Sequence, residues 1–331
     1  MTILPYPEPV DGSTTEKFGR KHFARKGTIM KNGNSTMSYI LRALGILPML
    51  AMLAASFCPA HAAQLQVNSN IPFTCASVLG GDTANGTPVI LYSCGDGPPQ
   101  QWNYNDGQLQ GIGTANGVTT CLEANGSTAG SKVVISACSG GQNQQWYFQD
   151  NNVVVVEGNL CLDSSPGLGN QLVVNACTPA TSQNWIVRGM EIQLNSNAPY
   201  VCFSVDGSLT ANGTQVLSYS CAEGPAESWY FESGEIVGLG TNGTKTKCLT
   251  AGGTTSGSLV EISTCNGGAK QKWLMAPGAR VGGSSSADVI AITFGNTNLC
   301  VDSAGGQPLG GGTQLLLNTC TGVSSQNWIV R

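Results

Sequence analysis

The sequence predicts an all-β protein made of two blocks of three repeats, preceded by a segment that is removed on export. Three observations support this: few charges, a tryptophan that recurs at a near-constant interval, and a second half that repeats the first. Charged residues are only 10% of the 331 residues, and 44 residues are Gly. Long amphipathic helices need Glu, Lys and Arg on their exposed faces, so short strands joined by Gly and Asn turns fit this composition better.

The first 62 residues have the features of an export signal. The apolar stretch from Ala43 to Ala55 is too short to span a bilayer and contains Pro48. Basic residues precede it, and the small residues 60–62 (Ala-His-Ala) follow it. We therefore expect a signal peptide cleaved after Ala62, which makes the protein secreted, extracellular or periplasmic.

Two alternatives concern this segment. The polar stretch before the apolar core is unusual for a signal, so the start codon is open between Met1, Met30 and Met37. A lipoprotein signal ending at Cys58 is disfavoured, because Phe57 is too large for the position before a lipidated cysteine.

The expected mature chain is acidic and contains no histidine. The first 62 residues hold seven of the 15 Lys and Arg and three of the 19 Asp and Glu, which leaves eight basic and 16 acidic residues. An acidic surface repels phosphate backbones, so nucleic acid is not an expected partner. His22 and His61 both lie in the removed segment, which excludes a Ser-His-Asp triad, a Cys-His pair and a His-ligated metal. We expect no cofactor, no metal and no membrane-spanning segment.

The cysteines fall into six successive pairs. Of 13 Cys, an even number remains without Cys58, as is typical of a disulfide framework in an exported chain. The members of a pair lie 16 to 20 positions apart, and none has the Cys-x-x-Cys spacing of a zinc or thioredoxin-like site. The expected structural disulfides are Cys75–Cys94, Cys121–Cys138, Cys161–Cys177, Cys202–Cys221, Cys248–Cys265 and Cys300–Cys320.

Every tryptophan follows the second Cys of a pair by a few residues. The intervals between them are 44, 39, 44, 44 and 55 residues, a period that indicates stacked or symmetric supersecondary units. Five close a Gln-x-Trp motif and one closes a Glu-x-Trp motif: Gln100-Gln101-Trp102, Gln144-Gln145-Trp146, Gln183-Asn184-Trp185, Glu227-Ser228-Trp229, Gln271-Lys272-Trp273 and Gln326-Asn327-Trp328.

A longer period decides between the architectures that share this interval. A ring of WD-repeat blades also has a period in the forties. Here, however, the stretch 66–94 matches 193–221 at most positions, an offset of 127, and the phrase SQNWIVR at 182–188 returns at 325–331. The chain is therefore a duplicated block of three, with an insertion near 276–288. We expect a removed segment at 1–62, a first domain at 63–189 and a second domain at 190–331.

Strand signals recur within each repeat. The stretches 131–138 (SKVVISAC) and 170–177 (NQLVVNAC) run apolar into the second Cys, and ANGT at 84–87 and 211–214 is a turn signal. We expect the Trp to fill a shared core and the Gln to tie its loop by hydrogen bonds.

Six copies of a Cys pair followed by Gln-x-Trp strongly resemble the ricin-type β-trefoil lectin family, over residues 64–331. The resemblance implies two tandem β-trefoils, each of three four-stranded repeats about a pseudo-threefold axis, with up to one shallow sugar pocket per repeat. In that family the pocket has an acid two residues after the first Cys, a wall residue two before the second Cys, and Asn-Gln leading into the Trp. Such a carboxylate accepts hydrogen bonds from adjacent sugar hydroxyls, and an aromatic wall covers the apolar side of the ring.

No repeat has the complete pattern. The third repeat of each block has the acid and the Gln, but an Asn at the wall and Ser182 or Ser325 in place of the pocket Asn. We expect the main carbohydrate contacts there: Asp163, Asn175 and Gln183, and Asp302, Asn318 and Gln326. A secondary pocket is expected in the second repeat, at Glu123, Asn143 and Gln144, with Ser136 at the wall.

The other repeats lack the acid. The first repeat of each block has an aromatic wall, Tyr92 or Tyr219, but Ser77 or Ser204 at the acid position. The fifth repeat has Thr250 and Lys270 and is not expected to bind sugar.

Each candidate also has a structural interpretation. Asp163 and Asp302 can serve only as braces for their Gln partners, and Tyr92 and Tyr219 can be ordinary strand aromatics, which we favour for these two. The stretch 238–243 (GLGTNG) matches G-x-G-x-x-G, but its counterpart lacks the spacing and no helix follows, so a turn is favoured over a nucleotide loop.

The leading functional interpretation is an exported, non-enzymatic lectin that binds glycans through several weak sites acting together. A glycosidase would need two carboxylates and no histidine, but the repeats account for nearly all of the mature chain. A structural or protein-binding trefoil, or the targeting subunit of a separate toxin or glycoside hydrolase, is the further alternative.

Overall fold

The computed structural model describes residues 62–68, 73–111, 118–195, 200–222, 224–238, 246–281, 287–304, 308–309 and 312–331. These residues form strands, turns and short 3-10 helices, which confirms the predicted all-β class. Among them, no helix has the length and apolar character needed to cross a membrane. The expected signal peptide, apart from Ala62, lies outside the described residues.

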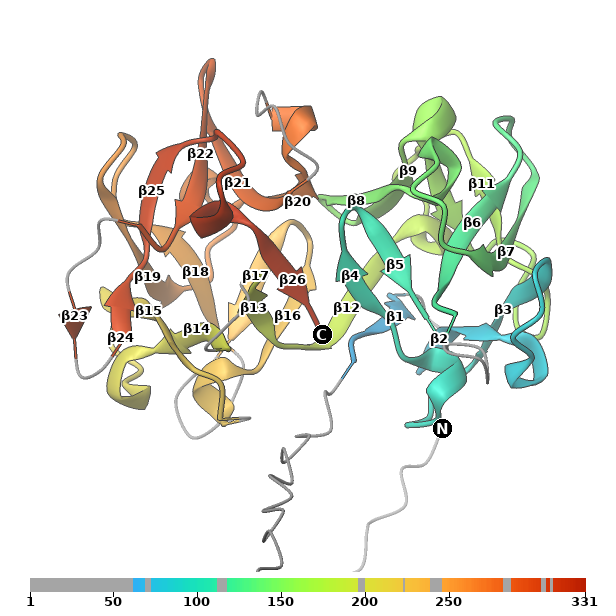
Figure 1. The fold of residues 1–331 in the computed structure, drawn as a ribbon, viewed down its shortest axis with the longest axis horizontal. Helices are drawn as coiled ribbons and strands as arrows, with labels where there is room; N and C mark the ends of the chain where they lie inside the picture. Colours follow the sequence, from blue (N-terminus) through green and yellow to red (C-terminus); the bar gives the residue numbers. More distant parts are fainter. Residues whose placement is uncertain are drawn as a thin grey trace, which may run out of the picture. The chain divides into compact units, whose positions relative to one another are not determined.

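The first part of the chain forms three units of four strands each (Figure 1). Unit 1 contains β1 (Gln64–Val67), β2 (Thr74–Val78), β3 (Thr87–Ser93) and β4 (Asn103–Asn105). Unit 2 contains β5 (Gln108–Gln110), β6 (Thr120–Asn125), β7 (Ser131–Ala137) and β8 (Trp146–Gln149). Unit 3 contains β9 (Asn152–Val155), β10 (Leu160–Asp163), β11 (Val173–Asn175) and β12 (Trp185–Met190). We call units 1 to 3 the first half.

The second half repeats this order. Unit 4 contains β13 (Ile192–Leu194), β14 (Val201–Val205), β15 (Thr214–Ser220) and β16 (Trp229–Glu232). Unit 5 contains β17 (Glu235–Gly238), β18 (Lys247–Ala251), β19 (Ser258–Thr264) and β20 (Leu274–Pro277). Unit 6 contains β21 (Asp288–Phe294), β22 (Thr297–Asp302), β24 (Gly312–Gln314), β25 (Leu316–Thr319) and β26 (Trp328–Val330), with β23 (Pro308–Leu309) as an added short strand paired with β24.

A short 3-10 helix precedes the Trp of every unit and ends on the Gln or Glu of the motif. These helices are η2 (Pro98–Gln100), η3 (Gln142–Gln144), η5 (Thr181–Gln183), η7 (Pro225–Glu227), η9 (Ala269–Gln271) and η11 (Ser324–Gln326). Others lie in turns between strands: η1 (Leu79–Gly81), η4 (Glu157–Asn159), η6 (Asp206–Ser208) and η10 (Gly278–Val281).

Strand pairings repeat three times within each half. In the first half, outer strands of neighbouring units pair and close a ring: β1 with β12, β4 with β5, and β8 with β9. The inner hairpins meet one another through β3–β7, β7–β11 and a bridge between Ile90 and Gln171. The second half has the same set, β13–β26, β16–β17, β20–β21, β15–β19, β19–β25 and β15–β24. The described strands therefore form two tandem β-trefoils, as predicted.

The six Trp rings fill the core, as predicted. Each is at most 2% exposed. Each indole N–H donates to the carbonyl of the residue that follows the first Cys of its own unit, over 2.9 to 3.3 Å. The Trp therefore joins the last strand of a unit to its second strand.

The six expected disulfides are present. Their Cα–Cα separations are 5.0 to 5.1 Å, and each links the strand that opens a hairpin to the segment that follows it. Loops of this size contribute about 3 kcal/mol each in the chain-entropy model. This stabilisation suits a chain whose strands are short and rich in Gly.

Strand pairings join the two halves, and each pairing has an equivalent in which the roles of the two halves are exchanged. β12 pairs with β16, and the corresponding strands β26 and β4 also pair. β8 pairs with β20, its own counterpart. Asn68 Nδ2 donates to Glu232 Oε1 at 3.0 Å, and at the same positions of the other half Asn195 Nδ2 donates to Asn105 Oδ1 at 3.3 Å. The halves are thus joined about a pseudo-twofold axis.

One apolar core runs through both halves. Tyr104 and Phe148 of the first half and Phe231 and Met275 of the second belong to a single buried cluster. The ring centroids of Phe148 lie 5.0 Å from Tyr104 and 6.1 Å from Phe231. The boundary expected between Gly189 and Met190 falls inside β12, and the division into domains at that point stays a proposal.

Because the core is continuous, we expect the two halves to unfold in one transition. Phe148→Ala should lower the free energy of unfolding by about 3–5 kcal/mol and leave that transition single. Differential scanning calorimetry measures both, with Tyr92→Ala as a matched control, since that ring is 55% exposed. Two separate transitions in the unchanged protein would contradict the shared core.

Candidate functional site

The Gln of each motif holds the backbone on both sides of the second Cys. In unit 3, Gln183 Oε1 accepts from the backbone N of Thr178 at 2.7 Å, and Gln183 Nε2 donates to the carbonyl of Ala176 at 3.0 Å. Units 1, 2, 5 and 6 make the same two bonds. The prediction that the Gln ties its loop is confirmed.

Unit 4 carries Glu227 instead. This buried side chain accepts from the backbone N of Ala222 at 2.6 Å through Oε2. A Glu side chain has an oxygen where Gln has its amide NH2, so it lacks the amide donor that makes the second bond in the other units.

We expect Glu227→Gln to stabilise the protein, because the amide supplies the missing donor. The free energy of unfolding should rise by about 1 kcal/mol, measured by urea denaturation. The reverse change in unit 3, Gln183→Glu, should lower it. A drop in stability on Glu227→Gln would show that the loop of unit 4 is held in another way.

In units 2, 3, 5 and 6, the Gln Nε2 also donates to the residue two positions after the first Cys. In unit 3 this is Asp163, which is 5% exposed. Its Oδ2 accepts from Gln183 Nε2 at 3.0 Å and from Asn175 Nδ2 at 2.9 Å. Its Oδ1 accepts from the backbone N of Ser165 at 2.7 Å. The acid, the wall residue and the Gln expected for this pocket are thus in direct contact.

Unit 6 has the same arrangement. Asp302 Oδ2 accepts from Gln326 Nε2 at 2.9 Å and from Asn318 Nδ2 at 3.2 Å. Its Oδ1 accepts from the backbone N of Ala304 at 2.7 Å. The wall amides are themselves fixed, because Asn175 Oδ1 accepts from Gly130 N and Asn318 Oδ1 accepts from Ser256 Oγ.

Hydrogen bonds keep Asp163 ionised at neutral pH. Burial alone raises the pKa of this carboxyl, but the bonds from Asn175, Gln183 and Ser165 outweigh burial and leave the pKa below its usual value. A carboxylate offers about four acceptor positions. Asn175, Gln183 and the backbone of Ser165 occupy three of them, and the Ser182 side chain also interacts with this carboxylate.

Unit 2 leaves its acid more open. Glu123 is half-buried, and Gln144 Nε2 donates to its Oε2 at 2.6 Å. This is its one hydrogen bond among the described residues. Asn143 is half-buried just before Gln144, and Ser136 lies opposite Cys121 in the strand register. The pocket therefore keeps more acceptor capacity than those of units 3 and 6.

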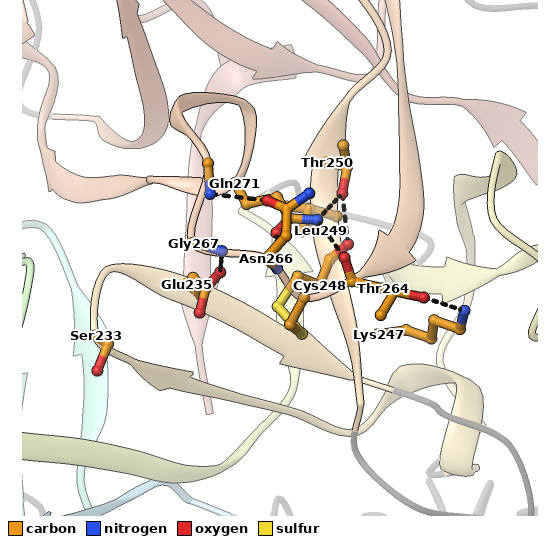
Figure 2. The surroundings of a disulfide bond; sticks show 12 residues. Ser233, Glu235, Lys247, Cys248, Leu249, Thr250, Thr264, Asn266, Gly267 and Gln271 are labelled. Atoms are coloured by element: carbon orange, nitrogen blue, oxygen red, sulfur yellow. Dashed lines mark hydrogen bonds between the residues drawn. A yellow bond between two sulfur atoms is a disulfide. The ribbon is translucent and has the colours of Figure 1, made fainter.

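Unit 5 shows what the Gln requires of its partner. Gln271 Nε2 donates to Thr250 Oγ1 at 3.0 Å, and Thr250 Oγ1 donates to the carbonyl of Cys248 at 2.8 Å. Figure 2 shows this chain of bonds beside the disulfide. A neutral hydroxyl thus serves the Gln as well as a carboxylate does.

Units 1 and 4 place an exposed tyrosine at the wall. Tyr92 is 55% exposed and Tyr219 is 38% exposed. The backbone of β24 approaches Tyr219 so closely that a Cβ on Gly312 would lie 2.9 Å from its ring. Tyr92 is therefore the more accessible ring of the two.

Two regions of the sequence, residues 64–185 and 190–328, match the model of the ricin-type beta-trefoil lectin domain. The chain belongs to this family. No curated protein matches it.

Several solved structures are similar to this ricin-type lectin. The agglutinin from Abrus precatorius has 19% identity and a TM-score of 0.34, with 83% of this chain and 98% of that chain covered. A non-toxic homologue of type II RIPs from Momordica charantia (bitter gourd), in complex with alpha-methyl-D-galactoside, has 22% identity and a TM-score of 0.32, with 82% and 98% covered. The designed threefold-symmetric protein ThreeFoil has 24% identity and a TM-score of 0.32, with 38% and 96% covered.

Some groups of the candidate pockets had not been expected from the sequence. The backbone N–H groups of Ser165 and Ala304 hold the acids, and a backbone group leaves no signal in residue type. An Asp bonded to the backbone two residues on is a common turn, which is the one signal that these pairs offered. The wall amides also donate to the acids, which follows only from the hairpin register.

The stability contributed by Asp163 should depend on pH. Since its folded pKa is lowered, this stability is present above the unfolded pKa of about 4 and is lost as pH falls through the folded value. At pH 7, Asp163→Asn should lower the free energy of unfolding by roughly 1.5–3 kcal/mol. Urea denaturation from pH 7 to pH 2 checks this, and the gap between the two proteins should close in acid. A difference in the free energy of unfolding that stays constant with pH would contradict the hydrogen bonds described for Asp163.

Proposed function

We propose that this lectin binds glycans outside the cell, without catalysis of its own, through the pockets of units 2, 3 and 6. The observation that supports this most is the comparison with unit 5. There Thr250 satisfies the Gln without any charge, so bracing does not require an acid. The acids of units 2, 3 and 6 are therefore not needed for bracing alone, and each adds carboxylate acceptors for which a sugar hydroxyl is a suitable donor.

The pockets are preorganised for such a ligand. The Gln and Asn amides hold Asp163 and Asp302 in one orientation, so little side-chain entropy is lost on binding. Glu123 has the most free acceptor positions, and we assign to it the strongest single contact. Each site is shallow, so useful affinity comes from several sites on one chain engaging one glycan surface.

Two further points complete the proposal. Each proposed pocket contributes one carboxylate, whereas glycoside hydrolysis uses a pair, which supports a non-catalytic lectin. Six disulfides support export, because such frameworks belong to oxidising compartments. We propose residues 63–189 and 190–331 as the two lectin domains, and a separately encoded toxin or enzyme chain as a partner.

A glycan array with the purified protein tests this function. We expect binding to a defined set of glycans and no release of sugar over time. Turnover of an arrayed glycan would show that the protein is an enzyme and not a lectin without catalysis. Silence on all glycans would favour the protein-binding alternative.

Variants then identify the pockets. Glu123→Gln, Asp163→Asn and Asp302→Asn should each weaken binding, because losing a charged acceptor costs about 1.5–3 kcal/mol, or tenfold to a hundredfold per site. Calorimetric titration with the best glycan from the array measures this. Thr250→Val is the matched control: it removes the partner of Gln271 and should lower the melting temperature but not the affinity. If the glycan affinity is unchanged in all three acid variants, the acids only hold their Gln partners in place and do not contact the sugar.

A further inference from the structure

A buried carboxyl group joins unit 6 to the first half. Asp288 opens β21, at the end of the insertion, and is 2% exposed. Its Oδ1 accepts from the backbone N of Gly107, in the turn between β4 and β5, at 2.6 Å. Its own backbone N donates to Asn327 Oδ1 at 3.1 Å. One acid thus links residues of the two halves that are 181 positions apart.

The second oxygen of this carboxyl has no donor. Oδ2 is buried, and none of the described residues donates a hydrogen bond to it. The Tyr104 hydroxyl lies against the carboxyl, but it gives its one hydrogen to the carbonyl of Trp146 at 2.9 Å. The Tyr104 oxygen can then only accept. Its contact with Asp288 is a hydrogen bond only when Oδ2 carries a proton.

We propose that Asp288 is a proton-dependent latch between the two halves. In its neutral form it accepts from Gly107 through Oδ1 and donates its Oδ2 hydrogen to Tyr104. Loss of the proton leaves a buried charge facing lone pairs of Tyr104 and weakens the junction.

The charges around this group favour the neutral form. Burial, first, and the nearby carboxylate of Asp106 raise the pKa of Asp288 well above its usual value, although the backbone N–H groups of Gly107 and Asp106 oppose them. On η10, the positive charge of Arg280 opposes the rise in the pKa of Tyr104, the neighbour of Asp288. On η9, Lys270 is exposed, while η11, β20, β8 and β26 carry no charged side chain. On β22, which pairs with β21, the Asp302 carboxylate accepts from Gln326 and Asn318.

Packing at the turn leaves little space for water beside the carboxyl. Gly107 has φ of +72°, and a Cβ there would lie 2.7 Å from Pro277 Cγ. Asp288 itself is 2% exposed, so an ionised carboxylate there would have little contact with solvent.

The sign of the pH effect follows from these contacts. The folded protein keeps the Asp288 proton at pH values where the unfolded chain has lost it. Unfolding then releases a proton, so stability falls as pH rises from about 4 to the folded pKa and is level above it. Across that window the equilibrium constant for unfolding rises by up to about tenfold per pH unit.

The test compares the full chain with its Asp288→Asn variant, in which an amide keeps the shape and the donor. Urea unfolding from pH 4 to pH 9 should show the variant gaining stability relative to the unchanged protein as pH rises, with a level difference at the highest pH. Asp106→Asn, at an exposed site, should move the window to lower pH. If the difference in the free energy of unfolding between the unchanged protein and Asp288→Asn does not vary with pH, the proposal is wrong.

A second measurement does not depend on any variant folding. The carbon-13 spectrum of the side-chain carboxyls of Asp in the unchanged protein should contain one resonance that titrates far above the ordinary value of about 4. If every Asp carboxyl titrates in the ordinary range, Asp288 is ionised at neutral pH and the proposal is wrong.

Discussion

The hydrogen bonds of one Gln side chain, present in five of the six units, are the interaction on which the rest of the structure depends. Through Oε1 and Nε2 this side chain holds the backbone on both sides of the second Cys. It thereby sets the position of the Trp two residues later, whose indole reaches back to the strand of the first Cys. Its other N–H orients the residue at the acid position. Fold and candidate site therefore share a single network, repeated along the chain.

Units 2, 3, 5 and 6 differ in the residue that accepts the second hydrogen bond from the Gln Nε2. With an Asp, as in units 3 and 6, the acid is held on three sides and is nearly buried. A Glu, as in unit 2, keeps the bond to the Gln but leaves most of the carboxylate free. A Thr, as in unit 5, still accepts the hydrogen bond from the Gln but carries no charge. One position thus converts a structural unit into a candidate binding unit at little cost to the fold.

Repetition made most of the fold predictable. Six Gln-x-Trp motifs, paired cysteines and the 127-residue offset were enough for the strands, the disulfides and the grouping by threes, because each unit confirms the reading of the others. The same argument brought Asp163, Asn175 and Gln183 into one pocket. It could not show that Asn175 donates to Asp163, which depends on hairpin register. Nor could it reveal Asp288, which follows an insertion without a counterpart in the first half and bonds to Gly107 far away in the sequence.

The central claim is that sugar binds where the Gln amides meet the carboxylates. Nitrogen-15 NMR of the Gln side-chain NH2 groups tests it most directly, because each group reports on one unit. On addition of a glycan selected on the array, we expect the signals of Gln144, Gln183 and Gln326 to shift, and those of Gln100 and Gln271 to stay in place. Shifts confined to the neighbourhood of Tyr92 or Tyr219, with the three Gln signals unmoved, would contradict the claim and leave the acids as parts of the fold alone.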